Sequence, residues 1–378
     1  MTRFRTSPLA LMGVLAVAAG LPPAAAAPAA AKPTPLPTYT ITDLGSLGGD
    51  VYPQTQAAGI NATGQVTGYS FTPTIVKEPC PYPSKTTCGF HPQHAFLWSN
   101  GAMTDLGTLG GPDQGSSGSA INRSGEVAGT AGVTGTAKTN GTHAALWTGT
   151  TTVDLGALAP LSSGSWSAAN GINDSGQVVG YWASSVSTIN TAAHPWLYSN
   201  GKMTSLPEPS GLTTPSCHAD MINNSGQIIG NCSNAGSNLQ AVLWQNGTVT
   251  TLGTLGGLQV TNVTGINNNG QIAGWGTTST GATDGFLDSN GTVTDLGSFL
   301  PYALNDNGVM VGTDDTGAAL IDSGGTVQNL QNLIPAKSGY LLGGADAIND
   351  NGQIVAPTTT TQTDPTTTGG HALLLTPN

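Results

Sequence analysis

Histidine is the side chain in this sequence best suited to bind a metal ion or to transfer protons, and four of the six histidines share one context. Each opens, or nearly opens, a phrase of the type His-Ala-Phe-Leu-Trp; they are His94, His143, His194 and His371. Equivalent histidines could form a metal ring. Three further copies of the phrase lack the histidine. In the ring of repeats predicted below, the phrase also lies away from the central axis. We therefore expect these histidines to bond a neighbouring backbone group or carboxylate, and we expect no metal site.

Aspartate recurs in two other phrases. One set precedes Leu-Gly and is expected to cap a turn or to discourage edge pairing; it consists of Asp43, Asp105, Asp154 and Asp295. The second set falls in turns of the type Asn-x-x-Gly; it consists of Asp174, Asp306 and Asp350. These turns do not match the calcium loop D-x-[DN]-x-[DN]-G, because Ile-Asn or Leu-Asn precedes each aspartate. Paired carboxylates for glycoside cleavage would have to come from different repeats.

Tryptophans fall into two groups. Trp98, Trp147, Trp196 and Trp244 recur at one position of the repeat and are expected in the core. Trp166, Trp182 and Trp275 occur outside the repeat, and Tyr82 and Phe90 lie in a long connection from Phe71 to Gln93. Aromatic side chains of this kind can stack on sugar rings or anchor a protein, and these five are our candidate ligand-binding residues. The alternative is ordinary packing under a loop.

Other chemistry is excluded by composition and by missing motifs. There is no G-x-S-x-G nucleophile motif and no G-x-x-x-x-G-K phosphate loop, so we expect no catalytic residue and no cofactor. A net charge of −11 with nine basic residues argues against nucleic acid as a partner. Charged residues make up 8% of the chain and glycine accounts for 54 residues, which excludes an all-α protein.

The repeat itself determines the fold class. The Ile-Asn or Leu-Asn phrase occurs seven times, with asparagines at 61, 122, 173, 223, 267, 305 and 349. The spacings are 61, 51, 50, 44, 38 and 44 residues, with a mean of 48, which is typical of propeller blades. Asn-x-x-Gly and Asn-Gly turns join short strand-like segments, so each unit is predicted to be four antiparallel strands. The first strand of each unit ends in the Ile-Asn or Leu-Asn phrase, and the second is the Gln-Val-Val-Gly type. The third is the His-Ala-Phe-Leu-Trp type, and the fourth is the Asp-Leu-Gly type.

The ends of the repeat region predict how the ring closes. The region begins with a fourth strand, Tyr39 to Gly45, and ends with a third strand, His371 to Leu375. The N-terminal strand is therefore expected to complete the last blade, which removes an open edge. We predict an all-β, seven-bladed β-propeller over residues 39–378, and we expect a monomer.

The phrases resemble the HAF repeat of probable extracellular bacterial proteins. His94-Ala95-Phe96-Leu97-Trp98, Asn100-Gly101, the Asp-Leu-Gly-Thr-Leu-Gly-Gly segment at 105–111 and Ile121-Asn122 match in order, and the resemblance covers residues 39–378. Blades five and six depart from it, because Asp284 and Ala318 replace the histidine. The resemblance implies export and a repeat architecture, and it implies no reaction.

The N-terminal sequence also predicts export. Arg3 and Arg5 precede a 14-residue apolar run and an alanine tract, which is typical of a signal peptide, here residues 1–27. Residues 28–38 are predicted to be a linker rich in proline and alanine, and no segment is apolar enough to span a membrane. The four cysteines suit an oxidising compartment, with Cys80–Cys88 and Cys217–Cys232 as the expected disulfides among three possible connectivities.

These observations favour a secreted binding or scaffold protein. Its ligand or partner face would be formed by the connections between the second and third strands and between successive blades, and the ligand would be a protein or a carbohydrate. The alternative is a secreted propeller enzyme, a hydrolase or lyase, that acts on polysaccharide. Acidic side chains clustered at the axial mouth of that face would favour the enzyme, and an aromatic groove without carboxylates would favour binding.

Overall fold

The computed structural model describes ten segments of the chain. They are residues 36–48, 54–78, 88–134, 141–149, 151–156, 166–183, 192–213, 215–234, 239–359 and 370–378. The predicted signal peptide and residues 28–35 of the predicted linker lie outside the described residues. In the described part, no helix has the length and apolar character needed to cross a membrane.

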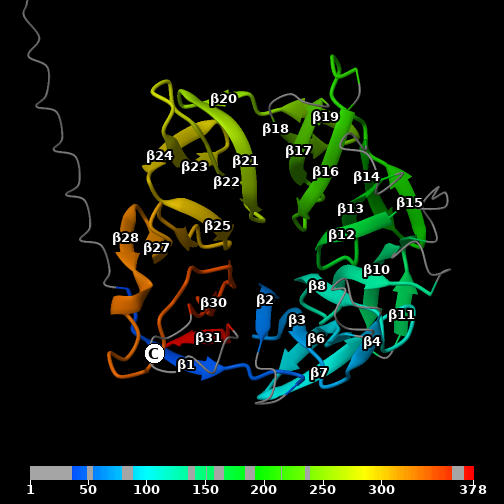
Figure 1. Ribbon diagram of the computed structural model, residues 1–378. Helices are drawn as coiled ribbons and strands as arrows, with labels where there is room; N and C mark the ends of the chain where they lie inside the picture. Colours follow the sequence, from blue (N-terminus) through cyan, green and yellow to red (C-terminus); the bar gives the residue numbers. More distant parts are fainter. Residues whose placement is uncertain are drawn as a thin grey trace, which may run out of the picture. The chain divides into compact units, whose positions relative to one another are not determined.

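Seven antiparallel sheets of four or five strands form a ring, which confirms the predicted seven-bladed propeller (Figure 1). Blade one contains β2 (Thr55–Ile60), β3 (Val66–Phe71), β6 (Gln93–Ser99) and β7 (Ala102–Gly107). Blade two contains β8 (Ser116–Ile121), β9 (Val127–Gly132), β10 (Thr142–Thr148) and β11 (Thr151–Asp154). Blade three contains β12 (Trp166–Ile172), β13 (Val178–Ala183), β14 (Ala193–Ser199) and β15 (Lys202–Ser205). Blade four contains β16 (Pro215–Ile222), β17 (Ile228–Asn234), β18 (Gln240–Gln245) and β19 (Thr248–Thr251).

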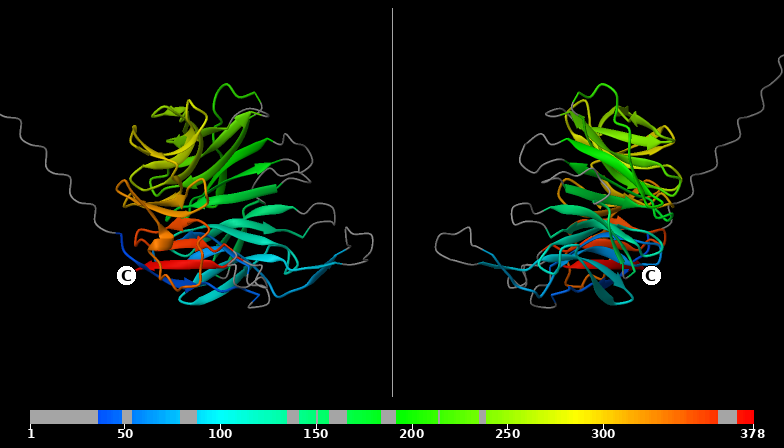
Figure 2. Two further views of the ribbon diagram at one scale, coloured as in Figure 1. Left: turned by 60° about the vertical axis from the view of Figure 1, so that its left-hand side comes forward. Right: turned by 90° about the vertical axis from the view of Figure 1, so that its right-hand side faces the viewer.

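The remaining blades follow the same plan. Blade five contains β21 (Leu258–Ile266), β22 (Ile272–Thr277), β23 (Thr283–Ser289) and β24 (Thr292–Gly297), with the short β20 (Thr254–Leu255) beside β21. Blade six contains β25 (Leu300–Leu304), β26 (Met310–Thr313), β27 (Ala319–Ser323) and β28 (Thr326–Asn329), and the 3-10 helix η3 (Leu330–Asn332) follows. Blade seven contains β29 (Ala347–Ile348), β30 (Ile354–Pro357), β31 (Ala372–Pro377) and β1 (Tyr39–Asp43). A hairpin of β4 (Val76–Glu78) and β5 (Cys88–Phe90) projects from blade one (Figure 2).

Blade seven joins the two ends of the propeller. β1 pairs with β31 from Tyr39 opposite Pro377 to Asp43 opposite Leu373, as the sequence predicts (Figure 1). The Asn378 N–H donates to the Thr38 carbonyl at 2.9 Å, and Leu36 packs against the apolar core of the blade. The contact between chain ends therefore extends beyond the predicted strand.

The asparagines of the Ile-Asn phrases form a closed ring of hydrogen bonds. In each blade the asparagine Nδ2 donates to the backbone carbonyl of the equivalent asparagine in the next blade, at 2.9–3.2 Å, and Asn349 closes the circle on Asn61. Each Oδ1 accepts the backbone N–H groups two and four residues later, for example those of Asn269 and Gln271 on Asn267. The sequence identified the turn but not this ring.

A β-bulge marks the first strand of blades one to six. The register skips one residue, three positions before the ring asparagine, as between Ala219 and Met221 in β16. The facing second strand has glycine at this height, and a Cβ on Gly230 would collide with the His218 carbonyl oxygen. Glycine thus permits the close backbone approach that the bulge requires.

The outer strands are held by apolar layers and by paired side chains. The four repeated tryptophans are buried, with exposed fractions between 1% and 7%, as predicted. The histidine of the third strand meets a carboxylate in the fourth strand or just beyond it, through His94–Asp105, His143–Asp154, His194–Glu208 and His371–Asp43, at 2.7–3.0 Å. Burial lowers the pKa of His94, but the hydrogen bond and charge of Asp105 outweigh this, and the net shift is upward.

The predicted disulfide Cys217–Cys232 links β16 to β17, where the two residues lie directly opposite each other. Cys80 lies outside the described residues, so Cys80–Cys88 stays a prediction.

Removal of the Cys217–Cys232 bridge is expected to weaken the fold without abolishing it. The bridge closes a loop of 15 residues, for which the chain-entropy model gives about 3 kcal/mol. The double variant Cys217→Ala with Cys232→Ala should lose about this much free energy of unfolding in urea titrations. The wild-type protein in reductant is the control, and an unchanged urea midpoint in both samples would contradict the expectation.

Candidate ligand site at the loop-face mouth of the central channel

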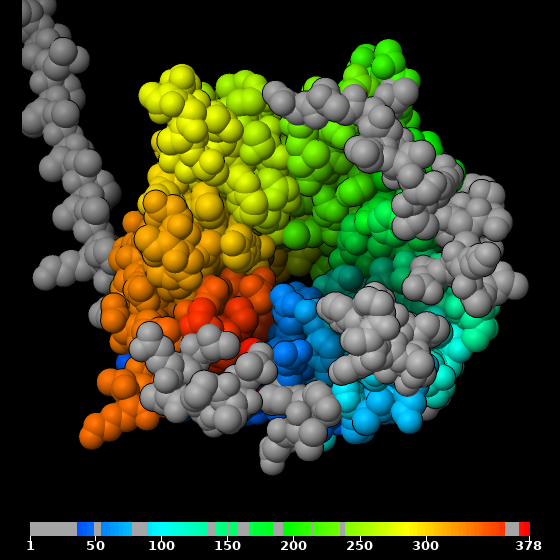
Figure 3. Space-filling model, viewed as in Figure 1, coloured from blue at the N-terminus to red at the C-terminus, as the bar shows by residue number. Residues whose placement is uncertain are grey.

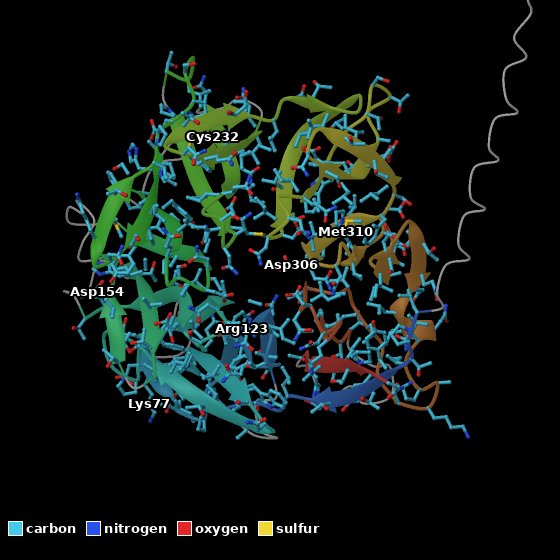
Figure 4. All side chains as sticks on the ribbon, turned by 180° about the vertical axis from the view of Figure 1, so that it is seen from behind. Lys77, Arg123, Asp154, Cys232, Asp306 and Met310 are labelled. Atoms are coloured by element: carbon cyan, nitrogen blue, oxygen red, sulfur yellow. A yellow bond between two sulfur atoms is a disulfide. The ribbon has the colours of Figure 1, made fainter. Side chains whose placement is uncertain are left out.

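The first strands of the seven blades line a central channel. One layer of side chains divides this channel into two cavities. The residue before each ring asparagine projects into the channel, and these residues are Ile60, Ile121, Ile172, Ile222, Ile266, Leu304 and Ile348. On the side of the tight turns, here the turn face, lies a cavity of about 340 Å³ lined by these residues, the ring asparagines and the residues that follow them. Arg123 and Asp306 mark its mouth near the axis (Figure 4).

The opposite end of the channel opens on the face formed by the connections between second and third strands and between blades, here the loop face. In blades five and six, the connections between second and third strands are tight turns at 278–282 and 314–318. Figure 3 shows the hollow at the centre of this face. A cavity of about 320 Å³ lies here, and every blade contributes to its wall, in each case including the residue three positions before the ring asparagine. We call this set the bulge ring; it consists of Ala58, Ser119, Asn170, Asp220, Thr264, Tyr302 and Asp346.

Six of these seven residues are the ones that the bulges set apart from the register, and in blade seven no bulge is recorded. A bulge directs a side chain that regular pairing would place elsewhere. Unlike the Ile and Asn positions, the bulge ring differs in almost every blade. A residue that only packs between blades has equivalent surroundings in every blade, so its type should repeat. The variation of the bulge ring therefore points to a local role.

A second cavity of about 470 Å³ extends outward from the bulge ring at blades four to six. β16 contributes His218 and Asp220, β17 contributes Asn231, β21 contributes Asn262, and β25 contributes Tyr302. The disulfide positions this wall, because Cys217 and Cys232 flank His218 and Asn231 in paired strands while their own side chains are buried on the core side. A volume of this size suits a small molecule or part of a larger one.

Asp220 is the chemical centre of the second cavity. Asn170 Nδ2 donates to its Oδ1 at 3.2 Å, and Asn231 Nδ2 donates to its Oδ2 at 3.0 Å. Burial raises the pKa of Asp220 to about 7, despite the opposing effect of these two hydrogen bonds. Since each carboxylate oxygen carries two lone pairs, one acceptor position remains on each oxygen for a ligand.

Two other titratable groups line the cavities to which Asp220 belongs. Burial raises the pKa of Asp346, across the channel in blade seven, to about 6. Burial lowers the pKa of His218, so that the neutral imidazole is favoured near pH 7. Among the residues that line the two cavities and that the structure describes, there is no lysine or arginine.

Aromatic rings pack against two residues that line the second cavity, His218 and Tyr302. Tyr181 stacks on His218 with ring centroids 3.9 Å apart, and Trp166 contacts Tyr181 edge to face at 5.1 Å. On the other side, Trp275 lies 6.0 Å from Tyr302, which is 36% exposed. The rings of Tyr181 and Tyr302 thus extend the walls formed by β16 and β25.

The predicted ligand-binding residues are distributed unevenly. Trp166 and Trp275 reach the surroundings of this cavity through Tyr181 and Tyr302. Trp182 lies instead against His194 in blade three, and Phe90 is 39% exposed at a separate cavity of about 270 Å³ between blades one and two. Tyr82 lies outside the described residues. A ligand role for all five stays a prediction.

Asp220, His218, Asn231 and Tyr302 were not among the candidates from sequence. Asp220 and Tyr302 occupy the bulge position, and the sequence does contain a signal for it. The position three residues before the repeated asparagine varies between blades, and the facing glycine of the second strand is repeated six times. An isolated glycine within a strand is a known mark of a bulge.

Comparison with solved structures finds other propellers at low similarity. The β-propeller domain of the Trilobed protease from Pyrococcus furiosus matches at 10% identity, covering 86% of this chain and 94% of that chain, with a TM-score of 0.46. A gluconolactonase from Xanthomonas campestris matches at 11% identity, with coverages of 92% and 96% and a TM-score of 0.38. The Aleuria aurantia lectin in complex with alpha-methyl-L-fucoside matches at 10% identity, with coverages of 78% and 96% and a TM-score of 0.39. At these scores the likenesses carry no argument about ligand or activity.

A search of curated proteins finds no match. A family model matches residues 50–316, which include blades one to five and the first two strands of blade six. The chain therefore belongs to the family of proteins of unknown function DUF3466.

Proposed function

We propose that this protein is an exported binding protein that takes a saccharide at the loop-face mouth of its channel. The observation that carries the proposal is the second cavity, where aromatic side chains stand beside carboxyl and amide groups. Aromatic faces cover the apolar faces of a sugar ring, and amides and carboxyls accept and donate hydrogen bonds to its hydroxyl groups. Asp220, Asn231, Asn262 and Tyr302 supply both kinds of contact on one wall.

Export is supported by three features. The N-terminal residues 1–27 have the pattern of a signal peptide, and Cys217–Cys232 is a bridge of the kind that persists in oxidising compartments. The phrases that resemble the HAF repeat of extracellular proteins support the same assignment, and we place the chain with those proteins as part of this proposal.

A saccharide screen tests the binding function. The full chain, expressed with its own N-terminal segment and recovered after export, would be applied to a glycan array, and hits would be measured by calorimetry. We expect Tyr302→Ala and Trp275→Ala each to weaken the best hit about tenfold, since a lost aromatic contact of about 1.4 kcal/mol corresponds to that factor. Melting temperatures should stay within a few degrees of the wild type.

Phe90→Ala is the matched control for a site at the second cavity. Phe90 was a candidate from the sequence, but it is an exposed aromatic residue of the same face at a different cavity, and the proposed site does not include it. Its affinity should equal that of the wild type. Absence of any saccharide hit, or equal losses in Phe90→Ala and Tyr302→Ala, would contradict the proposal.

A second candidate function rests on the carboxyl groups. Asp220 and Asp346 both lie at the axial mouth of the loop face, and a carboxyl with a pKa near 7 can act as a general acid. This arrangement favours a polysaccharide-cleaving enzyme by the criterion set from the sequence. Both oxygens of Asp220 accept hydrogen bonds from side-chain amides. A carboxyl held in this way is better suited to binding a sugar than to attacking a sugar carbon. Chromatography of each bound oligosaccharide after incubation separates the two, because an enzyme yields shorter products.

A further inference from the structure

Two carboxyl groups at the loop-face mouth have no cationic partner in the described part of the chain. The ion pairs among the described residues join histidines of the third strands to carboxylates in or just beyond the fourth strands. Neither Asp220 nor Asp346 takes part in one of them. Both carboxyls belong to the bulge ring, and both line the same cavity. Both side chains are half-buried, and a positive charge nearby would stabilise their ionised forms. A cationic ligand would supply that charge.

The hydrogen bonds around Asp220 hold its carboxyl in place without neutralising its charge. Asn170 and Asn231 are neutral donors, and Asn170 also donates to the Ala219 carbonyl at 3.1 Å. Asn231 in turn donates to Asn262 Oδ1 at 3.1 Å, so three amides fix the orientation of the group. A preorganised acceptor of this kind binds a charged donor at little cost in ordering.

The walls suit a cation as well. Tyr302 lines the cavity, and Tyr181 stacks on His218, which lines it from β16. An ammonium group is attracted to the face of an aromatic ring. An anionic sugar would instead meet two carboxyls and, among the described lining residues, no lysine or arginine. The net charge of −11 adds to the repulsion of anions.

We propose that the saccharide bound at this site carries free amino groups, and that its ammonium binds between Asp220 and the aromatic wall of the second cavity, with Asp346 as a further acceptor across the channel. This inference rests on the proposed saccharide-binding function and narrows it to amino sugars that are not N-acetylated. Acetylation removes the positive charge and leaves a bulky amide in its place.

The proposal predicts a pH dependence with a definite sign. Without ligand, Asp220 has a pKa of about 7 and is mostly protonated at pH 5, so it offers little charge to an ammonium. The groups that face it are His218 on its own strand, Tyr181 from β13, Tyr302 from β25 and Asp346 from blade seven. His218, whose pKa burial lowers, gains charge only on acidification and would then repel the ligand as well. Affinity for the ammonium should therefore rise about tenfold between pH 5 and pH 7.

The test compares oligomers of glucosamine with oligomers of N-acetylglucosamine of equal length, by calorimetry on the exported full chain at pH 5, 6 and 7. We expect at least a tenfold preference for glucosamine at pH 7. Asp220→Asn should remove most of the preference and most of its pH dependence. Asp346→Asn, at a carboxyl for which the described residues supply no hydrogen bond, should reduce the preference severalfold, and it keeps the test valid if Asp220→Asn fails to fold.

The outcomes separate this inference from the proposed function. Equal binding of both oligomers, with the losses expected for Tyr302→Ala, overturns the amine inference and leaves the binding function standing. A preference for glucosamine that persists unchanged in both aspartate variants also overturns the inference. Failure of both oligomers and of all neutral saccharides to bind contradicts the proposed function itself.

Discussion

Asn267→Ala is expected to lower the free energy of unfolding by about 3–4 kcal/mol. The side chain is 3% exposed and makes four hydrogen bonds, to Gln271 Oε1, to the Asn305 carbonyl, and from two backbone N–H groups of its own turn. Alanine leaves those two N–H groups without this acceptor inside a tight turn, and each buried unpaired group costs about 1–3 kcal/mol. It also breaks the ring of asparagines between blades five and six.

Asn269→Ala is the matched control two residues away in the same turn. Asn269 is exposed, and its side chain makes a single hydrogen bond, from Nδ2 to the Asp306 carbonyl at 2.7 Å. Its loss should cost less than about 1 kcal/mol. Urea titrations of the two variants would measure both values, and equal midpoints for Asn267→Ala and Asn269→Ala would refute a special role for the ring.

The asparagine ring explains why the sequence tolerates so few changes at one position and so many three residues earlier. Each asparagine bonds the backbone of its own turn and of the next blade, and no other side chain of that size both accepts and donates in this way. The bulge residue bonds neither turn, so its identity is free to differ. The same strand thus carries a fixed structural residue and a variable residue within three positions.

The architecture was predictable because the signals repeat. Seven Ile-Asn or Leu-Asn phrases and four Asn-Gly turns specify hairpins through local backbone chemistry, and the structure places Asn100, Asn200, Asn246 and Asn290 at positive φ as those turns require. Closure was predictable from the order of strands at the two ends. The Cys217–Cys232 bridge was predictable because the two cysteines are equidistant from a tight turn.

The candidate site was less predictable because it depends on three-dimensional convergence. Asp220 gains its elevated pKa from burial between blades three, four and five. Its hydrogen bonds with Asn170 and Asn231 could not be predicted from the spacing of these residues in the sequence. The single-copy tryptophans led to Trp166 and Trp275, but the tyrosine that lines the cavity is Tyr302, and Tyr181 stacks on the lining residue His218. The glycine of the second strand was the sequence signal for the bulge position. Blades one to six have this glycine and a bulge, whereas blade seven has Ala356 in its place and no recorded bulge.

Deletion of Tyr39 to Gly45 is expected to destabilise the whole ring by at least about 5 kcal/mol. Tyr39 is 2% exposed and packs with Leu330, Leu373 and Leu375, so its loss alone compares with a core aromatic replaced by alanine, about 3–5 kcal/mol. The deletion also removes Asp43, which accepts hydrogen bonds from His371 Nδ1 at 2.7 Å and from the Tyr340 hydroxyl at 3.0 Å. β31 is left as an open edge.

A rescue experiment separates loss of the strand from loss of a chain end. The Asn378 N–H bonds the Thr38 carbonyl at 2.9 Å, so residues 38–46 can be placed behind Asn378 through a two-residue Asn-Gly turn, and β1 would then form a hairpin with β31. The deletion should lower the melting temperature of the whole propeller in a single transition, and the permuted chain should recover most of it. If the deletion melts like the full chain, or if the permuted chain is no more stable than the deletion, then pairing of β1 with β31 does not close the ring.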